Sequence, residues 1–165
     1  NKVQEAESKW KEIKLNKKEL QLHMLGKLQT NKVKQAVKIF DYLHSLDSIK
    51  LAQKISEEQK KIKKNLKIFI QINIGNENQK NGIMVNELND FYNKCIKDFD
   101  LNIIGLMCLP PAQKDPSNYF EIMKKEARNL SLPELSMGMS GDYLKAIEFN
   151  ASFLRIGSKI FGERN

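Results

Sequence analysis

The fold is decided by the stretch Leu135–Arg164, LSMGMSGDYLKAIEFNASFLRIGSKIFGER. Its pattern predicts a short strand, a turn rich in glycine and serine, an amphipathic helix, an apolar strand at 153–156 and a second Gly-Ser turn. A strand–helix–strand crossover makes the two strands parallel, so their carboxyl ends point the same way. We therefore expect an α/β fold in which the two turns lie side by side.

The two turns combine glycine with serine: Ser140 and Gly141 in the first, Gly157 and Ser158 in the second. Unpaired backbone N–H groups at such turns suit a phosphate. A pair of these turns on the last two strands is typical of the phosphate site of (β/α)₈ barrels. Glycines at strand–helix turns can also be purely conformational, and this alternative stays open.

Arg155 lies between the two turns. In a strand, positions 153, 155 and 157 share one face. An arginine among apolar neighbours is costly unless it has a partner. That partner is either a ligand atom or a carboxylate on a neighbouring strand, and the nearby turns favour the ligand.

In the rest of the sequence, predicted helices alternate with predicted strands. There is no linker or long repeat, so we expect a single domain that spans residues 1–165. We expect strands at 20–25, 42–45, 66–74, 101–107, near 135 and at 153–156. Helices are expected at 3–13, 30–39 (with Thr30 as N-cap), 48–64 (capped by Ser48), 85–99, 116–130 and between the last two strands. Six strands alternating with helices predict a parallel sheet whose ligand site lies at the strand carboxyl ends.

Composition and residue spacing disfavour several classes of binding partner. The net charge is +8, but only three of 28 basic residues are arginine, whereas nucleic-acid readers usually concentrate arginine along one groove. Cys95 and Cys108 have no partner at metal spacing, and His23 and His44 alone are a weak metal signal. The longest apolar stretch, 103–112, is too short to cross a bilayer. We therefore expect a cytoplasmic protein with no nucleic acid, membrane or metal partner.

Several uncommon short sequence motifs are distributed along the whole sequence. They are HMLGKLQTNK (23–32), HSLD (44–47), KNG (80–82), GLM (105–107), MGMSGD (137–142), RIGS (155–158) and FGER (161–164). Together they resemble the motifs of the pyridoxal phosphate homeostasis (pyridoxal phosphate-binding) proteins, single-domain relatives of the alanine racemase barrel. The resemblance covers essentially all 165 residues.

The resemblance implies a (β/α)₈ TIM barrel of the alanine racemase N-terminal type, with about six of its eight strands in this sequence. Residues 1–6 resemble the family's segment after the second strand, so the first strand, first helix and second strand are expected to be missing. In the family, the lysine that bonds covalently to pyridoxal phosphate ends that first strand. No lysine of this sequence occupies an equivalent place.

The cofactor implied by the resemblance is pyridoxal 5'-phosphate, with Arg155 facing the pyridine nitrogen. A permanent cation there disfavours protonation of the ring, which makes the ring a weak electron sink. Met107 and Met139 could pack on the ring, although methionines at strand ends are more often simple core. The full set expected to bind the cofactor is Ser140, Gly141, Arg155, Gly157, Ser158, Met139, His23, Asn31, Ser45 and Met107.

The resulting functional hypothesis is a monomeric, non-catalytic carrier or buffer of pyridoxal phosphate in vitamin B6 homeostasis, which passes the cofactor to apo-enzymes. We assign no catalytic residue. One alternative is a pyridoxal phosphate enzyme of the alanine racemase type. Those relatives need a second domain with a tyrosine base, whereas this sequence ends at Asn165, just after the second turn. The other alternative, a basic RNA-associated domain, is disfavoured by the scarce arginine.

Overall fold

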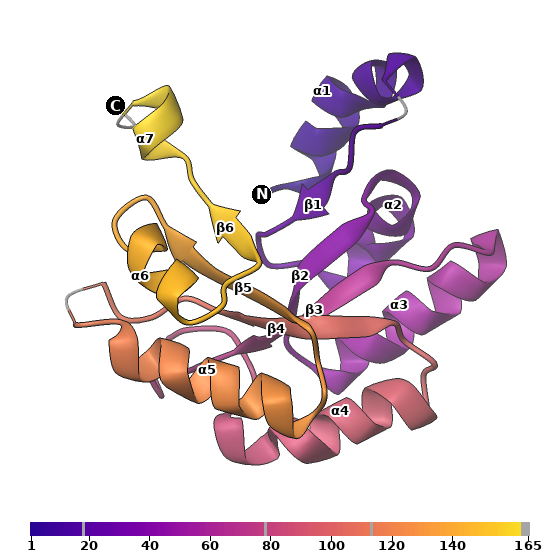
Figure 1. Cartoon of the computed structure of the whole chain (residues 1–165). Helices are drawn as coiled ribbons and strands as arrows, with labels where there is room; N and C mark the ends of the chain where they lie inside the picture. The colour runs from indigo at the N-terminus through magenta and orange to yellow at the C-terminus, as the bar shows by residue number, and fades with distance from the viewer. Residues whose placement is uncertain (18, 78, 113, 163–165) are drawn as a thin grey trace.

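The computed structural model describes residues 1–17, 19–77, 79–112 and 114–162, so Glu163 and Arg164 of the last motif lie outside it. Six parallel strands form one sheet in which each strand pairs with the next along the chain (Figure 1). The strands are β1 (His23–Met24), β2 (Tyr42–Leu46), β3 (Lys67–Ile72), β4 (Ile103–Cys108), β5 (Glu134–Met139) and β6 (Phe153–Arg155). Within the described residues, the six strands and the parallel sheet that the sequence predicted are confirmed.

Helices cover the outer side of the curled sheet, except for the short last helix, which extends beyond the sheet and buries no residue (Figure 1). They are α1 (Val3–Asn16), α2 (Val33–Ile39), α3 (Ile49–Ile62), α4 (Leu88–Lys97), α5 (Ser117–Asn129), α6 (Tyr143–Glu148) and α7 (Ser158–Phe161), with 3₁₀ turns η1 (Thr30–Lys32) and η2 (Val85–Glu87). In the part of the chain that the structure describes, no helix is long and apolar enough to span a bilayer. The architecture is an incomplete (β/α) barrel, as predicted.

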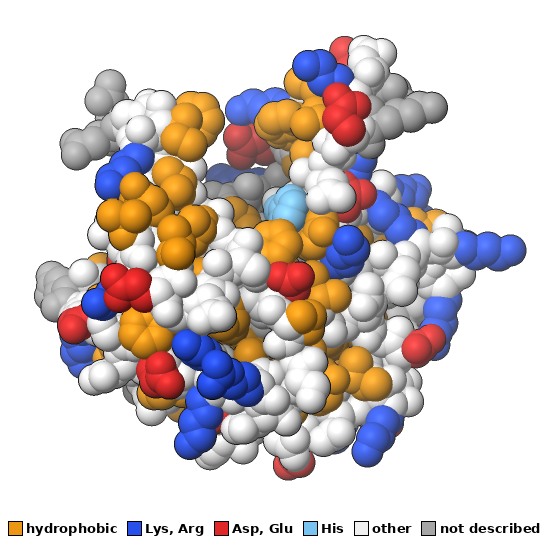
Figure 2. Space-filling view, viewed as in Figure 1, with side chains coloured by type: hydrophobic (Ala, Val, Ile, Leu, Met, Phe, Trp, Pro, Cys, Tyr) orange, Lys and Arg blue, Asp and Glu red, His pale blue; other side chains and the backbone are white. Residues whose placement is uncertain are grey.

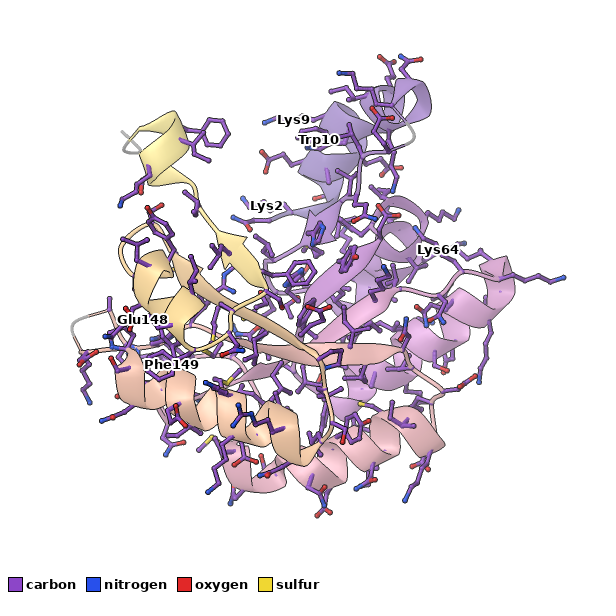
Figure 3. The ribbon with its side chains drawn as sticks, in the orientation of Figure 1. Lys2, Lys9, Trp10, Lys64, Glu148 and Phe149 are labelled. Atoms are coloured by element: carbon purple, nitrogen blue, oxygen red, sulfur yellow. The ribbon has the colours of Figure 1, made fainter. Side chains whose placement is uncertain are left out.

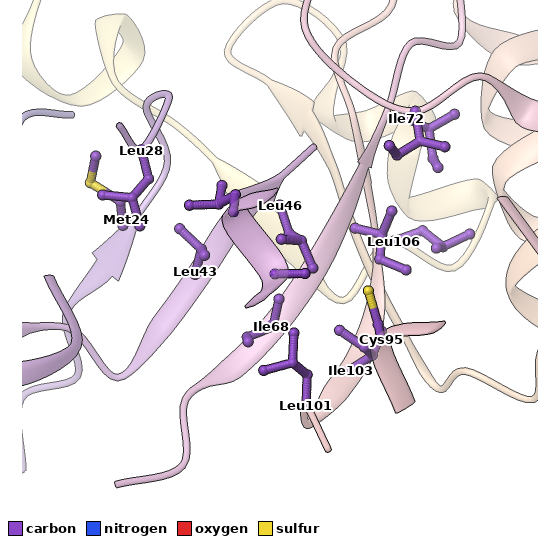
Figure 4. Close-up of a cluster of buried hydrophobic side chains, with 14 of the residues drawn as sticks. Met24, Leu28, Leu43, Leu46, Ile68, Ile72, Cys95, Leu101, Ile103 and Leu106 are labelled. Carbon is purple, nitrogen blue, oxygen red and sulfur yellow. The ribbon is translucent and has the colours of Figure 1, made fainter. Parts of the chain in front are cut away.

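The two faces of the sheet bury different side chains because strand residues alternate. Ile68, Ile70 and Ile72 of β3 point outward into the main apolar core, which Figure 4 shows in close-up. Phe69, between them, points inward and joins a second buried cluster with Tyr42 and Met107. The inner cluster fills the hollow side of the sheet and forms a base beneath the strand carboxyl ends.

Local signals predicted some boundaries better than others. Ser48 caps α3 as expected, accepting a hydrogen bond from the Leu51 N–H at 3.4 Å. Thr30 does not cap a helix, because it begins the 3₁₀ turn η1 and the cap position is Gln29, without a side-chain bond.

The first strand is shorter than the predicted 20–25. The Leu22 N–H donates to the Asp41 carboxylate at 2.8 Å, and the Leu22 carbonyl accepts from the Asp41 and Tyr42 N–H groups. A side chain thus replaces part of the backbone ladder before His23, and regular pairing with β2 begins only there.

Candidate cofactor site

The two Gly-Ser turns lie against each other at the carboxyl ends of β5 and β6. The Gly157 N–H donates to the Ser140 hydroxyl oxygen at 3.2 Å, and Met139 is the Cα partner of Arg155 across the strand pair. The Asp142 carboxylate closes the first turn by accepting from the Met139 N–H at 2.6 Å. The proximity expected from the crossover is present.

Both turns leave room for a ligand. A methyl group built on Gly141 or Gly157 would meet no atom within 4 Å. Ser158 follows immediately as the first residue of α7, where the leading backbone N–H groups have no acceptor within the helix. Open space bordered by N–H groups and two serine hydroxyls matches the requirements of a phosphate.

Arg155 points inward from β6 toward the interior beside these turns. One terminal nitrogen, Nη1, donates to the Ser136 hydroxyl at 2.8 Å, and the other, Nη2, donates to the Cys108 carbonyl at 2.8 Å. The third nitrogen, Nε, is buried and has no hydrogen-bond partner. Among the residues that the structure describes, no carboxylate lies within ion-pair distance of Arg155. The alternative of a carboxylate partner is therefore not supported, and Nε–H is left for a ligand acceptor.

A chain of hydrogen bonds continues from Arg155 into the hollow of the sheet. Ser136 Oγ lies 2.8 Å from His44 Nδ1, and His44 Nε2 lies 2.9 Å from His23 Nδ1. The four side chains come from β6, β5, β2 and β1, so the chain connects strands that are far apart in the sheet order.

Burial keeps the two histidines of this hydrogen-bond chain neutral, so that Arg155 is its one charged side chain. Burial, helped by the nearby His23 and Arg155, lowers the pKa of His44 to about 3. Burial also lowers the pKa of His23, partly offset by Asp41, and it lowers the pKa of the Arg155 guanidinium. Arginine keeps its proton at any physiological pH because its reference pKa is so high. At neutral pH the site therefore holds one guanidinium cation and two neutral imidazoles.

Aromatic rings pack around the histidines. His23 stacks on Tyr42 with centroids 4.1 Å apart, and His44 stacks on Phe69 at 4.3 Å. Phe153 of β6 lies within 6 Å of all four rings. This packing restrains the ring planes, so the hydrogen bonds of the histidines have defined directions.

The predicted site residues divide into two groups. The structure brings Ser140, Gly141, Arg155, Gly157 and Ser158 together at one edge.

Of the other predicted residues, Met139 adjoins this group, whereas Met107, Ser45 and Asn31 are packed, hydrogen-bonded or located elsewhere. Met107 is buried in the inner cluster, and Met139 is 42% exposed beside Arg155. The Ser45 hydroxyl is buried and donates to the Gly26 carbonyl at 2.8 Å. Asn31 is exposed and lines a separate groove against α3.

His23 requires a correction. The expected strands 20–25 and 42–45 would put His23 and His44 close to strand ends. In the structure His23 begins β1, level with the first residue of β2, and His44 lies within β2. Two side chains, Ser136 and His44, separate His23 from Arg155. The short β1 places His23 in the hollow of the sheet, where it stacks on Tyr42 and ends the hydrogen-bond chain from Arg155, and its contact with the cofactor stays a prediction.

The lysines near the inner cluster lie at the amino ends of the strands. Lys67 begins β3 and donates to the Tyr42 hydroxyl at 3.0 Å, as expected for a residue far from the site. Lys64, labelled in Figure 3, donates to the Phe40 carbonyl just before β2. Within the described ranges, no three histidine, cysteine or acidic residues are grouped as metal ligands.

Sequence reasoning missed Ser136 and Phe153. Ser136 alternates with the outward Leu135 and Met137, so a buried serine on the inner face of β5 was the available signal. Phe153 shares a face with Arg155, which the strand period already implied. The contacts of Ser136 with residues 92 and 19 positions away carried no local signal.

Comparison with known proteins shows which domain family the chain belongs to. The family model for the alanine racemase N-terminal domain matches residues 1–165. Alanine racemase of Clostridium difficile shares the fold, with a TM-score of 0.73 at 14% identity over 95% of this chain and 43% of that one. The fold and the site thus define a barrel of the alanine racemase N-terminal type.

More similar relatives narrow the assignment. A pyridoxal phosphate homeostasis protein of Aquifex aeolicus is 35% identical over 99% of this chain and 75% of its own length, and one of Pasteurella multocida is 34% identical over 100% and 75%. PipY of Synechococcus elongatus, in its structure with PLP bound, has a TM-score of 0.88 at 31% identity, covering 98% of this chain and 79% of that one. The chain belongs to the pyridoxal phosphate homeostasis protein family.

Proposed function

We propose that this protein binds pyridoxal 5'-phosphate and acts as a non-catalytic carrier or buffer of the cofactor in cytoplasmic vitamin B6 homeostasis. It would release the cofactor to apo-enzymes. The relatives named pyridoxal phosphate homeostasis proteins and the PLP-bound PipY structure support this role. The observation that carries it is the buried, unpaired Nε–H of Arg155 beside two open glycine turns.

The residues present fit the two ends of the cofactor. Ser140 and Ser158 would hold the phosphate through their hydroxyls, and Gly141 and Ser158 through backbone N–H groups. Gly157, whose N–H already donates to Ser140, would leave room for the phosphate. Arg155 Nε–H would donate to the pyridine nitrogen, because Nε is the guanidinium nitrogen that is buried and has no hydrogen-bond partner within the protein. Charge-assisted hydrogen bonds contribute about 1.5–3 kcal/mol each, so four of them contribute about 6–12 kcal/mol. After an association cost of about 4 kcal/mol or more, these residues alone give micromolar binding at the strongest.

The same arrangement favours holding the cofactor over using it. When bound, pyridoxal phosphate supplies an electron sink whose strength depends on a protonated ring nitrogen. Arg155 places a permanent cation at that position and opposes protonation, and the described residues offer no carboxylate beside it to favour a proton there.

The face shown in Figure 2 gives the RNA alternative no support. On the face shown in Figure 2, the lysine and arginine side chains are scattered among acidic and neutral ones and do not gather into a stripe. A nucleic-acid groove requires a continuous basic path.

Titration of the protein with pyridoxal phosphate, followed by cofactor absorbance and protein fluorescence, tests the proposal. We expect Arg155→Ala to weaken binding about tenfold or more, since it removes a hydrogen bond to a charged group. Arg128→Ala, which removes an exposed arginine of α5, should leave binding unchanged. Failure of the parent protein to bind the cofactor would refute the proposal, and racemisation of D- or L-alanine would refute its non-catalytic part.

A further inference from the structure

The direction of the hydrogen-bond chain follows from its charged end. A guanidinium can only donate, so Ser136 Oγ accepts from Arg155 Nη1. The single O–H of Ser136 is then available for the other neighbour, His44 Nδ1, at 2.8 Å. A neutral His44 that accepts at Nδ1 carries its proton on Nε2 and donates it to His23 Nδ1 at 2.9 Å.

We propose that Ser136 and His44 are positioning residues that hold the Arg155 guanidinium in the orientation that presents Nε–H to the cofactor. Each bond in the chain gives a donor to an acceptor, and Arg155 sets the order of all of them. The ligand in this inference rests on the proposed function, whereas the order of donors and acceptors rests only on the geometry within the protein.

The chain positions the arginine and does not transfer protons. Proton transfer along these hydrogen bonds to the site would require the Arg155 guanidinium to accept a proton, and a guanidinium has no acceptor atom. A static role also agrees with the packing, because stacking on Phe69 fixes the His44 ring plane and stacking on Tyr42 fixes that of His23.

Burial makes the positioning strong. Ser136 and His44 are 0% and 1% exposed, so water does not compete for their hydrogen bonds. The second bond of Arg155, from Nη2 to the Cys108 carbonyl at 2.8 Å, fixes the other terminal nitrogen. Two bonds at separate nitrogens determine the plane of a rigid guanidinium, and therefore the direction of Nε–H.

The histidine tautomers test the order of the chain without any cofactor. Long-range ¹H–¹⁵N NMR of the ligand-free protein at neutral pH should show His44 protonated at Nε2 and bare at Nδ1, with His23 bare at Nδ1. A proton on His44 Nδ1 would overturn the inference, because Ser136 would then accept from both neighbours.

Substitution tests the positioning itself. Ser136→Ala should weaken pyridoxal phosphate binding about tenfold, the effect of losing a hydrogen bond to a charged group, and should alter the His44 tautomer signal. Ser56→Ala is the matched control: Ser56 is also buried, but its hydroxyl donates to the Phe99 carbonyl at 2.6 Å, outside the chain. The control should lose stability with affinity unchanged.

A second pair separates positioning from packing. His44→Asn keeps an acceptor near the place of Nδ1, whereas His44→Leu keeps volume and removes the acceptor. We expect Asn to retain affinity within about threefold and Leu to lose about tenfold. Equal affinity for the parent, Ser136→Ala and His44→Leu would overturn the inference. If the parent binds no cofactor, the proposed function fails, and the tautomer measurement still decides the order of the chain.

Discussion

At the scale of single residues, Arg155 explains most of the site. It is the inward side chain of β6 next to the glycine turns, and its charge is permanent. Because a buried cation is costly, the protein surrounds it with oxygen acceptors and keeps both nearby imidazoles neutral. The remaining unpaired Nε–H is a cost to the folded protein that a ligand acceptor would remove.

Buried His44 makes the protein sensitive to acid. Its pKa is about 3 in the folded protein and near 6.5 when unfolded, so the unfolded chain takes up the proton first as pH falls. The stability is therefore present above pH 6.5 and is lost toward pH 3. Between pH 7 and 4.5 we expect this residue to reduce the free energy of unfolding by roughly 2–3 kcal/mol. Urea unfolding of the parent and His44→Asn should show that difference, and parallel pH curves for the two proteins would contradict it.

Substitution by alanine should lower the stability of the protein at one glycine and leave it unchanged at another. A methyl group at Gly105 would lie 2.1 Å from the Glu134 carbonyl oxygen and 2.8 Å from the Phe69 ring, so Gly105→Ala should cost about 3 kcal/mol. Gly141→Ala meets open space and should change stability by less than about 0.5 kcal/mol.

Ligand binding should distinguish the second glycine further. If the phosphate occupies the space beside Gly141, its alanine variant should bind pyridoxal phosphate about tenfold more weakly despite normal stability. Chemical denaturation and cofactor titration of both variants measure the two effects. Unchanged affinity of Gly141→Ala would place the phosphate elsewhere.

At the scale of elements, α3 depends on its N-cap. Ser48 satisfies the Leu51 N–H, so Ser48→Ala should reduce the free energy of unfolding by about 1 kcal/mol. Ser8 provides a control, because its hydroxyl donates to the Glu5 carbonyl within exposed α1 and caps no terminus. Ser8→Ala should change stability by less than about 0.5 kcal/mol. Equal losses in the two variants would show that the cap contributes nothing.

The sequence predicted elements where local pattern and tertiary role agree. Outward isoleucines alternate along β3 with inward residues, and this strand was located within two residues at each end. β1 was overestimated because Asp41, distant in sequence, takes over its first hydrogen bonds. The turns and Arg155 could be predicted as one edge because chain topology alone brings them together. The hydrogen-bond chain from Arg155 to His23 could not be predicted from the sequence, because it depends on how strongly the sheet curls.

At the scale of the whole molecule, the curl brings the two edges of the sheet toward each other. His23 of β1 and Phe153 of β6 have ring centroids 5.8 Å apart although their strands are at opposite ends of the sheet order. The same Phe153 ring lies 5.2 Å from Phe69 in β3. One side chain therefore joins both halves of the arc and supports the inner base under the cofactor site.

This role predicts a large effect for Phe153 and none for another phenylalanine nearby. Phe153→Ala should reduce the free energy of unfolding by about 2 kcal/mol, because the partly buried ring loses its contacts with four other rings. Phe161 of α7 is 85% exposed, so Phe161→Ala should stay within about 0.5 kcal/mol of the parent. Urea unfolding measures both, and near-ultraviolet circular dichroism should show loosened ring packing only in Phe153→Ala. A stable Phe153→Ala protein with unaltered ring signals would mean that the curl is held by the backbone ladder and outer helices alone.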